Sequence, residues 1–130
     1  MQRNSAGYKA VALAIAANAL PVMAGAAQAQ TAPANAGQAL FQQRCQMCHV
    51  NDASGRNGVG PNLYRLRGRA AGVQPKFAYS AALKASKVTW SRETLDTFLI
   101  APNKMVPGTK MVVTVPDAKQ RAALVAYLMK

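Results

Sequence analysis

Acidic side chains, cysteine and histidine are scarce in this chain of 130 residues. Only four residues are Asp or Glu, two are Cys and one is His. A structural zinc site needs four nitrogen or sulfur ligands, and the cysteines and the histidine together supply three. The sequence also has no alternating strand pattern of useful length, no internal repeat, and no strand–helix–strand pattern of the kind that surrounds a thioredoxin-like dithiol. A zinc site is therefore excluded, and a redox dithiol is disfavoured.

The two cysteines and the histidine lie together, in Cys45-Gln46-Met47-Cys48-His49. Two thiols three residues apart can reach the two vinyl groups on one edge of a porphyrin, and the next residue then directs its imidazole at the iron. A disulfide between the two cysteines would leave His49 without a role. The motif predicts one haem c, attached covalently through Cys45 and Cys48, with a redox dithiol and a chance match as the weaker alternatives.

The first 29 residues have the pattern of an export signal. Arg3 and Lys9 give a positive start, Ala10 to Leu20 form an apolar stretch, and a small-residue cleavage site ends at Ala29. The alternative is an uncleaved membrane anchor. This alternative is disfavoured because the stretch is rich in alanine, and thus weakly hydrophobic, and contains an internal proline. We therefore expect three segments: a signal peptide over 1–29, a flexible lead-in over 30–36 and one domain over 37–130.

Positive charge dominates the chain. The formal net charge is +12, and removal of Arg3 and Lys9 with the signal leaves +10. Such an imbalance favours an anionic partner that is steered electrostatically. Nucleic acid is disfavoured because the sequence has no nucleic-acid-binding motif, and a solvated basic surface without a partner is the other alternative. Export agrees with haem attachment, which in bacteria takes place outside the cytoplasm, so we expect a periplasmic protein.

Hydrophobic spacing and capping residues predict helices only. Apolar residues from Gly37 to Arg44 recur at helical spacing just before the cysteine motif. Residues 51–62 are rich in glycine and are expected to form a loop. Ser91 can cap a helix that ends before Pro102, and Asp117 can cap a final helix. The predicted fold class is all-α, with short helices, long loops and a single domain.

Further short motifs run through the chain from Gly37 to Lys130. They are Gly37-x-x-Leu40-Phe41, Gly60-Pro61-Asn62-Leu63, Gly68-Arg69, Phe77-x-Tyr79-Ser80, Thr89-Trp90, Glu93-Thr94-Leu95, Pro107-Gly108-Thr109-Lys110-Met111 and Ala126-Tyr127-Leu128. In this order, together with the cysteine motif, they resemble class I cytochromes c, above all the mitochondrial-type members and related bacterial soluble cytochromes c. The resemblance implies a single-domain cytochrome c fold, in which short helices and loops wrap around one covalently bound haem.

The resemblance implies two axial ligands for the haem iron, His49 and Met111. Thioether sulfur is a soft ligand that favours ferrous iron and raises the reduction potential. Met105 lies in a similar loop and is the competing candidate. With both axial positions taken, no position is open for dioxygen or peroxide. The implied function is therefore that of an electron carrier and not of an enzyme.

Other residues match positions that surround the haem in this family. The Pro61 carbonyl is expected to accept a hydrogen bond from the His49 ring, which would fix the tautomer of the ligand. Four more positions match residues that hold the haem propionates, whose charges are costly in an apolar pocket: Arg69, Tyr79, Trp90 and Thr109. Plain core packing is the alternative for the two aromatic residues. The terminal helices are expected to cross through Gly37, Phe41, Leu124 and Tyr127.

We therefore expect a soluble periplasmic carrier with one haem. It would take single electrons from a quinol-oxidising complex or a periplasmic dehydrogenase and pass them to a terminal oxidase or reductase. We expect a monomer that binds no nucleic acid and docks on acidic redox proteins, through basic side chains such as Arg44, Arg56, Lys104 and Lys110. Two other functions stay open: a haem enzyme or gas sensor with an open sixth site, and a membrane-anchored respiratory subunit.

Overall fold

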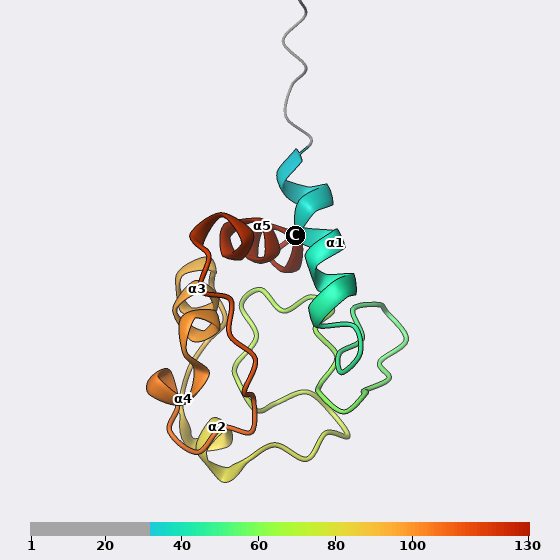
Figure 1. Ribbon diagram of the computed structural model, residues 1–130. Helices are drawn as coiled ribbons and strands as arrows, with labels where there is room; N and C mark the ends of the chain where they lie inside the picture. The colour runs from blue at the N-terminus through green and yellow to red at the C-terminus, as the bar shows by residue number, and fades with distance from the viewer. Residues whose placement is uncertain (1–31) are drawn as a thin grey trace, which may run out of the picture.

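The computed structural model describes residues 32–130, and this part of the chain folds into short helices joined by long loops (Figure 1). The helices are α1 (Ala32–Arg44), α2 (Ala81–Ala85), α3 (Arg92–Ile100), α4 (Pro102–Met105) and α5 (Ala118–Leu128). One isolated bridge between Ala70 and Thr89 joins two loops without making a sheet. The predicted all-α fold is confirmed. The signal peptide expected over 1–29 lies outside the described residues.

Helix α1 begins at Ala32, inside the stretch that the sequence suggests as a lead-in, and ends at Arg44, where the cysteine motif starts. Pro33 is compatible with this early start because the first turn of a helix has no intrahelical partner for its N–H groups. Arg44 in the last turn lies at the negative end of the helix dipole, which favours a cation.

Helices α1 and α5 cross in close contact, as predicted. A Cβ atom at Gly37 would collide with the carbonyl oxygen of Ala123 and would lie 2.7 Å from the Cβ of Tyr127. One turn later, the rings of Phe41 and Tyr127 pack with their centroids 5.6 Å apart. Glycine at position 37 therefore lets the two backbones approach each other more closely than any other residue would allow.

Helix α3 has the cap that the sequence predicts. The Ser91 hydroxyl accepts a hydrogen bond from the Thr94 N–H at 3.2 Å, and the Thr94 hydroxyl accepts one from the Ser91 N–H at 2.8 Å. Its apolar face then turns Leu95, Phe98 and Leu99 into the core. Pro102 does more than end this helix, because it occupies the first position of α4, a short helix that the sequence pattern did not reveal.

Helix α5 begins where predicted, with the Asp117 carboxylate accepting a hydrogen bond from the Gln120 N–H at 2.8 Å. It is fastened to α3 by Arg121, whose Nε lies 2.7 Å from the Asp96 carboxylate. The same guanidinium donates to the carbonyl groups of Val115 and Pro116. Arg121 therefore joins the two helices and the chain entering α5.

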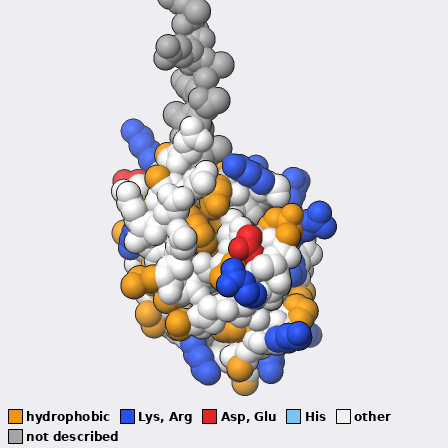
Figure 2. All heavy atoms as spheres, turned by 90° about the vertical axis from the view of Figure 1, so that its right-hand side faces the viewer, with side chains coloured by type: hydrophobic (Ala, Val, Ile, Leu, Met, Phe, Trp, Pro, Cys, Tyr) orange, Lys and Arg blue, Asp and Glu red, His pale blue; other side chains and the backbone are white. Residues whose placement is uncertain are grey.

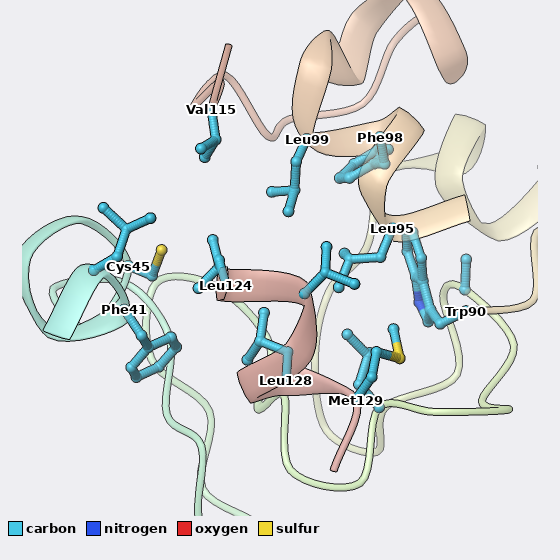
Figure 3. Close-up of a cluster of buried hydrophobic side chains, with 14 of the residues drawn as sticks. Phe41, Cys45, Trp90, Leu95, Phe98, Leu99, Val115, Leu124, Leu128 and Met129 are labelled. Atoms are coloured by element: carbon cyan, nitrogen blue, oxygen red, sulfur yellow. The ribbon is translucent and has the colours of Figure 1, made fainter. Parts of the chain in front are cut away.

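The core lies where α1, α3 and α5 meet (Figure 3). Leu124 and Val115 are fully buried, and Met129 is 1% exposed. In Figure 3, labelled side chains converge on α5 from the end of α1, from α3, from the loop that carries Trp90 and from Val115 in the chain leading into α5. Within residues 32–130, no helix is both long enough and apolar enough to span a membrane.

Candidate functional site

The cysteine motif forms a tight turn that continues from α1. The Cys45 N–H donates to the Phe41 carbonyl at 2.8 Å, and the Cys48 and His49 N–H groups both donate to the Cys45 carbonyl, at 3.0 and 2.8 Å. Both cysteines are free thiols, Cys45 buried and Cys48 half-buried. Burial raises the pKa of the Cys45 thiol. One turn thus presents two unpaired sulfur atoms and an imidazole, the set that haem attachment requires.

The His49 ring is held by the loop that follows the motif. Its Nδ1 lies 2.8 Å from the Pro61 carbonyl oxygen, which can only accept, so Nδ1 carries the proton. Burial lowers the pKa of His49, and the bond to Pro61 acts in the opposite direction to a smaller extent. The imidazole is therefore neutral at physiological pH, and its Nε2 has a free lone pair, as a metal ligand needs.

Gly60 leaves the space in which this ring lies. A Cβ atom at position 60 would come within 2.7 Å of Nδ1 and 2.8 Å of Nε2 of His49. The Gly60 N–H donates to the Cys48 carbonyl at 2.8 Å, which ties the loop back to the motif. The position of the imidazole thus depends on a residue without a side chain, eleven positions along the chain.

Asn62 organises the same loop. Its side chain is 1% exposed and bridges two segments: Nδ2 donates to the Asp52 carbonyl at 3.0 Å, and Oδ1 accepts from the Tyr64 N–H at 2.8 Å. The Asn62 N–H donates to the Asn57 side chain at 2.9 Å. The sequence placed Asn62 in a motif but gave it no role. A polar residue directly after the Gly-Pro pair was the available signal for a loop-fixing side chain.

Arg69 and Tyr79, two of the residues expected near the propionates, lie close together. The Arg69 guanidinium donates to the Gln74 side chain at 2.6 Å and to the Asn62 carbonyl at 2.7 Å. Burial lowers the pKa of Arg69 from its usual value, and the neighbouring Tyr79 opposes this effect. Burial raises the pKa of Tyr79, while a hydrogen bond to the Gln74 backbone and the Arg69 charge lower it. Both groups keep their ordinary protonation states: a cation and a neutral hydroxyl.

Trp90 belongs to the core. It is 8% exposed, and its ring meets Phe98 edge to face with the centroids 5.1 Å apart. Tyr79 makes a similar contact with Phe77, at 4.8 Å. The packing role that the sequence left open for these two aromatic residues is therefore present, and contact with a propionate stays a prediction for both.

Thr109 and Met111 share a turn after α4. The Thr109 N–H donates to the Val106 carbonyl at 3.1 Å, Gly108 adopts the left-handed φ of +89°, and the buried Thr109 hydroxyl accepts from the Met111 N–H at 3.4 Å. Met111 and its competitor Met105 are both partly buried against the core. Packing alone does not choose between the two sulfur atoms as a ligand.

These residues fit a covalently bound haem. Two free thiols follow one helix, the neutral imidazole of His49 is fixed beside them, and Gly60 leaves room for that imidazole. Within residues 32–130, no cluster of three or more His, Cys, Asp or Glu side chains offers another metal site. The haem would be held through Cys45, Cys48 and His49.

Known proteins resemble this chain along most of its described length. The sequence profile of the family described as Cytochrome c matches residues 34–130. Cytochrome c 2.1 of Caenorhabditis briggsae is 44% identical over 93 residues, which cover 71% of this chain and 82% of that protein. Cytochrome c2 of Rhodopila globiformis is 43% identical over 93 residues, covering 71% and 87%. The solved structure of cytochrome cH from Methylobacterium extorquens superposes with a TM-score of 0.67 at 41% identity, covering 73% of this chain and 95% of that one.

Proposed function

Because the chain belongs to the class I cytochrome c family, we propose that it is a periplasmic carrier of single electrons with His49 and Met111 as axial ligands. Members of this family are mono-haem electron carriers and not enzymes, and the cysteine motif implies haem c attached to Cys45 and Cys48. When bound, the haem supplies one-electron iron chemistry. The protein holds and shields this group.

The observation that carries the proposal is the fixed, neutral imidazole of His49. Its Nδ1 proton is held by the Pro61 carbonyl, so the ring keeps one orientation and one protonation state. A ligand that does not move or titrate keeps the reorganisation on electron transfer small. Met111 would supply the second protein ligand to the iron, so that dioxygen and peroxide would find no free coordination position.

The competing function, a haem enzyme or gas sensor, needs that position open. Met111→Ala should abolish the long-wavelength iron–sulfur charge-transfer band of the oxidised protein and lower the reduction potential. Met105→Ala is the matched control, because it removes another partly buried thioether, from the preceding helix, and should leave the band in place. An intact band in Met111→Ala would exclude Met111 as the ligand, and a band missing from the unchanged protein would favour the enzyme or sensor.

We propose that a quinol-oxidising complex or periplasmic dehydrogenase reduces the protein and that a terminal oxidase or reductase oxidises it. The net charge supports acidic partners, and Arg44, Arg56, Lys104 and Lys110 are all exposed. Reduction by an anionic redox protein should slow steeply with added salt, because screening weakens steering. Rates that stay constant between about 0.01 and 0.15 M salt would contradict electrostatic docking.

Export is tested separately from electron transfer. A protein secreted into the periplasm and cleaved as proposed begins at Gln30. The haem-containing protein is isolated separately from the membrane fraction and the soluble fraction of the cells that produce it. Edman sequencing or intact mass then shows whether its first residue is Gln30. A chain that keeps residues 1–29 and sediments with the membrane would favour the anchored respiratory subunit.

A further inference from the structure

Asn57 and Gly58 form the only Asn-Gly pair in the chain. In such a pair, the glycine nitrogen can lose its proton and bond to Cγ of the asparagine, which closes a five-membered succinimide ring. The bond between Cγ and the side-chain nitrogen breaks, and ammonia leaves. Water then opens the ring to aspartate or isoaspartate. Glycine favours this attack because it has no Cβ atom to shield its nitrogen and its backbone reaches conformations that other residues avoid.

The Asn57 side chain ties two segments of the chain together. Its Oδ1 accepts a hydrogen bond from the Asn62 N–H at 2.9 Å, and its Nδ2 donates to the Pro75 carbonyl at 2.9 Å, eighteen residues along the chain. The first partner can only donate and the second can only accept. An amide supplies both an acceptor and a donor on one short side chain, whereas a carboxylate supplies acceptors only. The fold therefore needs asparagine at this position and is weakened by aspartate.

Gly58 is required by the packing of the same loop. A Cβ atom at position 58 would collide with the Cys48 carbonyl oxygen. The Gly58 N–H donates to the Gly60 carbonyl at 2.9 Å, which closes a tight turn. The loop thus needs an amide at position 57 and a glycine at position 58 for two independent reasons. Their adjacency creates a reactive pair that the packing cannot replace.

We propose that Asn57 is a site of spontaneous deamidation that the folded loop protects, so that its conversion records how often the 51–62 loop opens. In the folded protein, two hydrogen bonds hold the amide, and the nitrogen that must lose its proton donates it to the Gly60 carbonyl. These three bonds must break before the Gly58 nitrogen can attack. No residue of 51–62 belongs to the apolar core, so this loop opens at a lower free energy than the whole protein unfolds.

The surroundings favour the reaction once the loop is open. The loop lies on the face that Figure 2 turns toward the viewer, and the charged side chains seen on that face are mostly Lys and Arg. Arg56, directly before Asn57, is exposed. Positive charge stabilises the deprotonated nitrogen and the anionic intermediate that precedes ring closure. The product cannot donate to the Pro75 carbonyl, and the lost ammonia does not return, so each conversion leaves the loop permanently less well held.

The test incubates the haem-containing protein at mildly alkaline pH, in buffer and in enough guanidinium to unfold it. Cation-exchange chromatography separates the deamidated form by its lower net charge, and mass spectrometry of its peptides locates the change. Asn62 and Asn103, which are followed by Leu and Lys, are internal controls. In guanidinium, Asn57 should react before either control. In buffer it should react more slowly by roughly tenfold or more, where tenfold corresponds to an opening free energy of about 1.4 kcal/mol.

Two variants test the role of the loop. Asn62→Ala keeps the backbone N–H that holds Asn57 but releases the loop from Asp52 and Tyr64. It should speed the reaction in buffer several-fold and leave the rate in guanidinium unchanged. Asn103→Ala is the matched control, an exposed asparagine outside the loop, and should change neither rate. Equal rates in buffer for the two variants would overturn loop opening as the step that limits the reaction.

The remaining outcomes separate the site from its consequence. An Asn57 that stays unmodified in guanidinium would overturn the site, and equal rates in buffer and guanidinium would overturn its protection by the fold. Asn57→Asp reproduces the aspartate product and should unfold at a lower guanidinium concentration than the unchanged protein, because the Pro75 carbonyl loses its donor. An unchanged unfolding midpoint would show that deamidation does not weaken the loop.

Discussion

The molecule has two parts that are stabilised in different ways. The helical part consists of α1, α3, α4 and α5, and the loop part is residues 49–90, in which α2 is the only helix. Of the buried apolar side chains among the described residues, the loop part contributes Leu66, Ala71 and Trp90, and nearly all the others come from the helical part and the chain leading into α5. The helical part thus forms most of the packed core, and the loop part contributes few side chains to it.

Polar contacts replace packing in the loop part. Asn62 and Arg69 hold backbone carbonyl groups and amides of segments that have no regular hydrogen-bond partners. The loop part also contains every non-glycine residue with a left-handed φ among residues 32–130: Arg65, Lys76 and Lys87. The comparison teaches that the terminal helices can associate by their own packing, whereas the loops depend on a few polar side chains and on the apolar body of the haem.

The largest expected effect is in the helical part, at the crossing of α1 and α5. Gly37→Ala should destabilise the holoprotein by about 3 kcal/mol, because the new methyl group would meet the Ala123 carbonyl, a backbone atom that cannot move aside. Helix propensity alone predicts a gain of about 1 kcal/mol for the same change. The measurement is guanidinium unfolding followed by helical circular dichroism.

Ala39→Gly is the control for this prediction. Ala39 is exposed on the same helix, so its replacement should cost only the propensity term of about 1 kcal/mol. If Gly37→Ala is neutral or stabilising, the helices do not cross as closely as described, and close packing is not what stabilises the helical part.

The second effect is in the loop part. Asn62→Ala should cost about 2 kcal/mol, because the Asp52 carbonyl and the Tyr64 N–H both lose their bond to a buried side chain. The loss should spread to the haem site, since Asn62 directly follows the Pro61 carbonyl that holds His49. We therefore expect a shifted reduction potential together with lower stability.

Asn57→Ala sharpens this prediction. Asn57 bonds the same loop through the Asn62 N–H and the Pro75 carbonyl, but Asn57 itself is less buried than Asn62 and its bond to Pro75 is exposed. It should cost about 1 kcal/mol and leave the potential unchanged. Equal reduction potentials in the unchanged protein, Asn62→Ala and Asn57→Ala would show that Asn62 stabilises the loop without affecting the haem site.

Most of the helical part was predictable from the sequence, apart from α4 and the early start of α1, whereas the hydrogen-bond network of the loop part was not. The caps at Ser91 and Asp117 are local signals with one physical meaning, and both are found where predicted. The helix crossing at Gly37, which the family resemblance implies, is also present. The loop network depends on side chains such as Asn62 and Arg69 meeting backbone groups up to ten positions away. No periodic pattern encodes such contacts, because they are set by the path of the chain.

The cysteine motif was decisive for the site because the two thiols that attach the haem and the histidine ligand are adjacent in the sequence. The bond between His49 and Pro61 was expected only from family resemblance, and it is present. Met105 and Met111 show the limit of both approaches. They are six residues apart and both partly buried against the core, so neither sequence spacing nor packing decides which sulfur binds iron.

A third effect compares the caps of two helices. Ser91→Ala should cost about 1 kcal/mol in global unfolding, because it removes the capping box of α3, whose residues form part of the core. Ser80 caps α2 in the same way, accepting from the Leu83 N–H at 3.1 Å, but α2 has five residues and buries none of them. Ser80→Ala should therefore leave global stability nearly unchanged and increase hydrogen exchange only within α2. Equal global losses would show that the loop part unfolds together with the helical part.

The smallest effect has the opposite sign. Lys87 follows the C-cap residue Ser86 of α2 and has a left-handed φ of 55°. At this position after a helix, a left-handed residue is usually glycine. A side chain with a Cβ atom costs about 1–2 kcal/mol there, whereas glycine costs about 0.5–1 kcal/mol through the entropy of the unfolded chain. Lys87→Gly should therefore stabilise the protein by roughly 0.5 kcal/mol.

Lys84→Gly removes the same charge from the neighbouring turn of α2, where the backbone is helical, and so it controls for electrostatics. It should destabilise by up to about 1 kcal/mol, giving opposite signs for two lysines three positions apart. Both are measured by guanidinium unfolding of the haem-containing protein. If both variants lose stability, the left-handed turn at Lys87 is not strained. If Lys87→Gly gains stability, the native lysine keeps a positive charge in this turn although its left-handed backbone conformation lowers the stability of the protein. Among the described residues, the helical part has no non-glycine residue in that conformation.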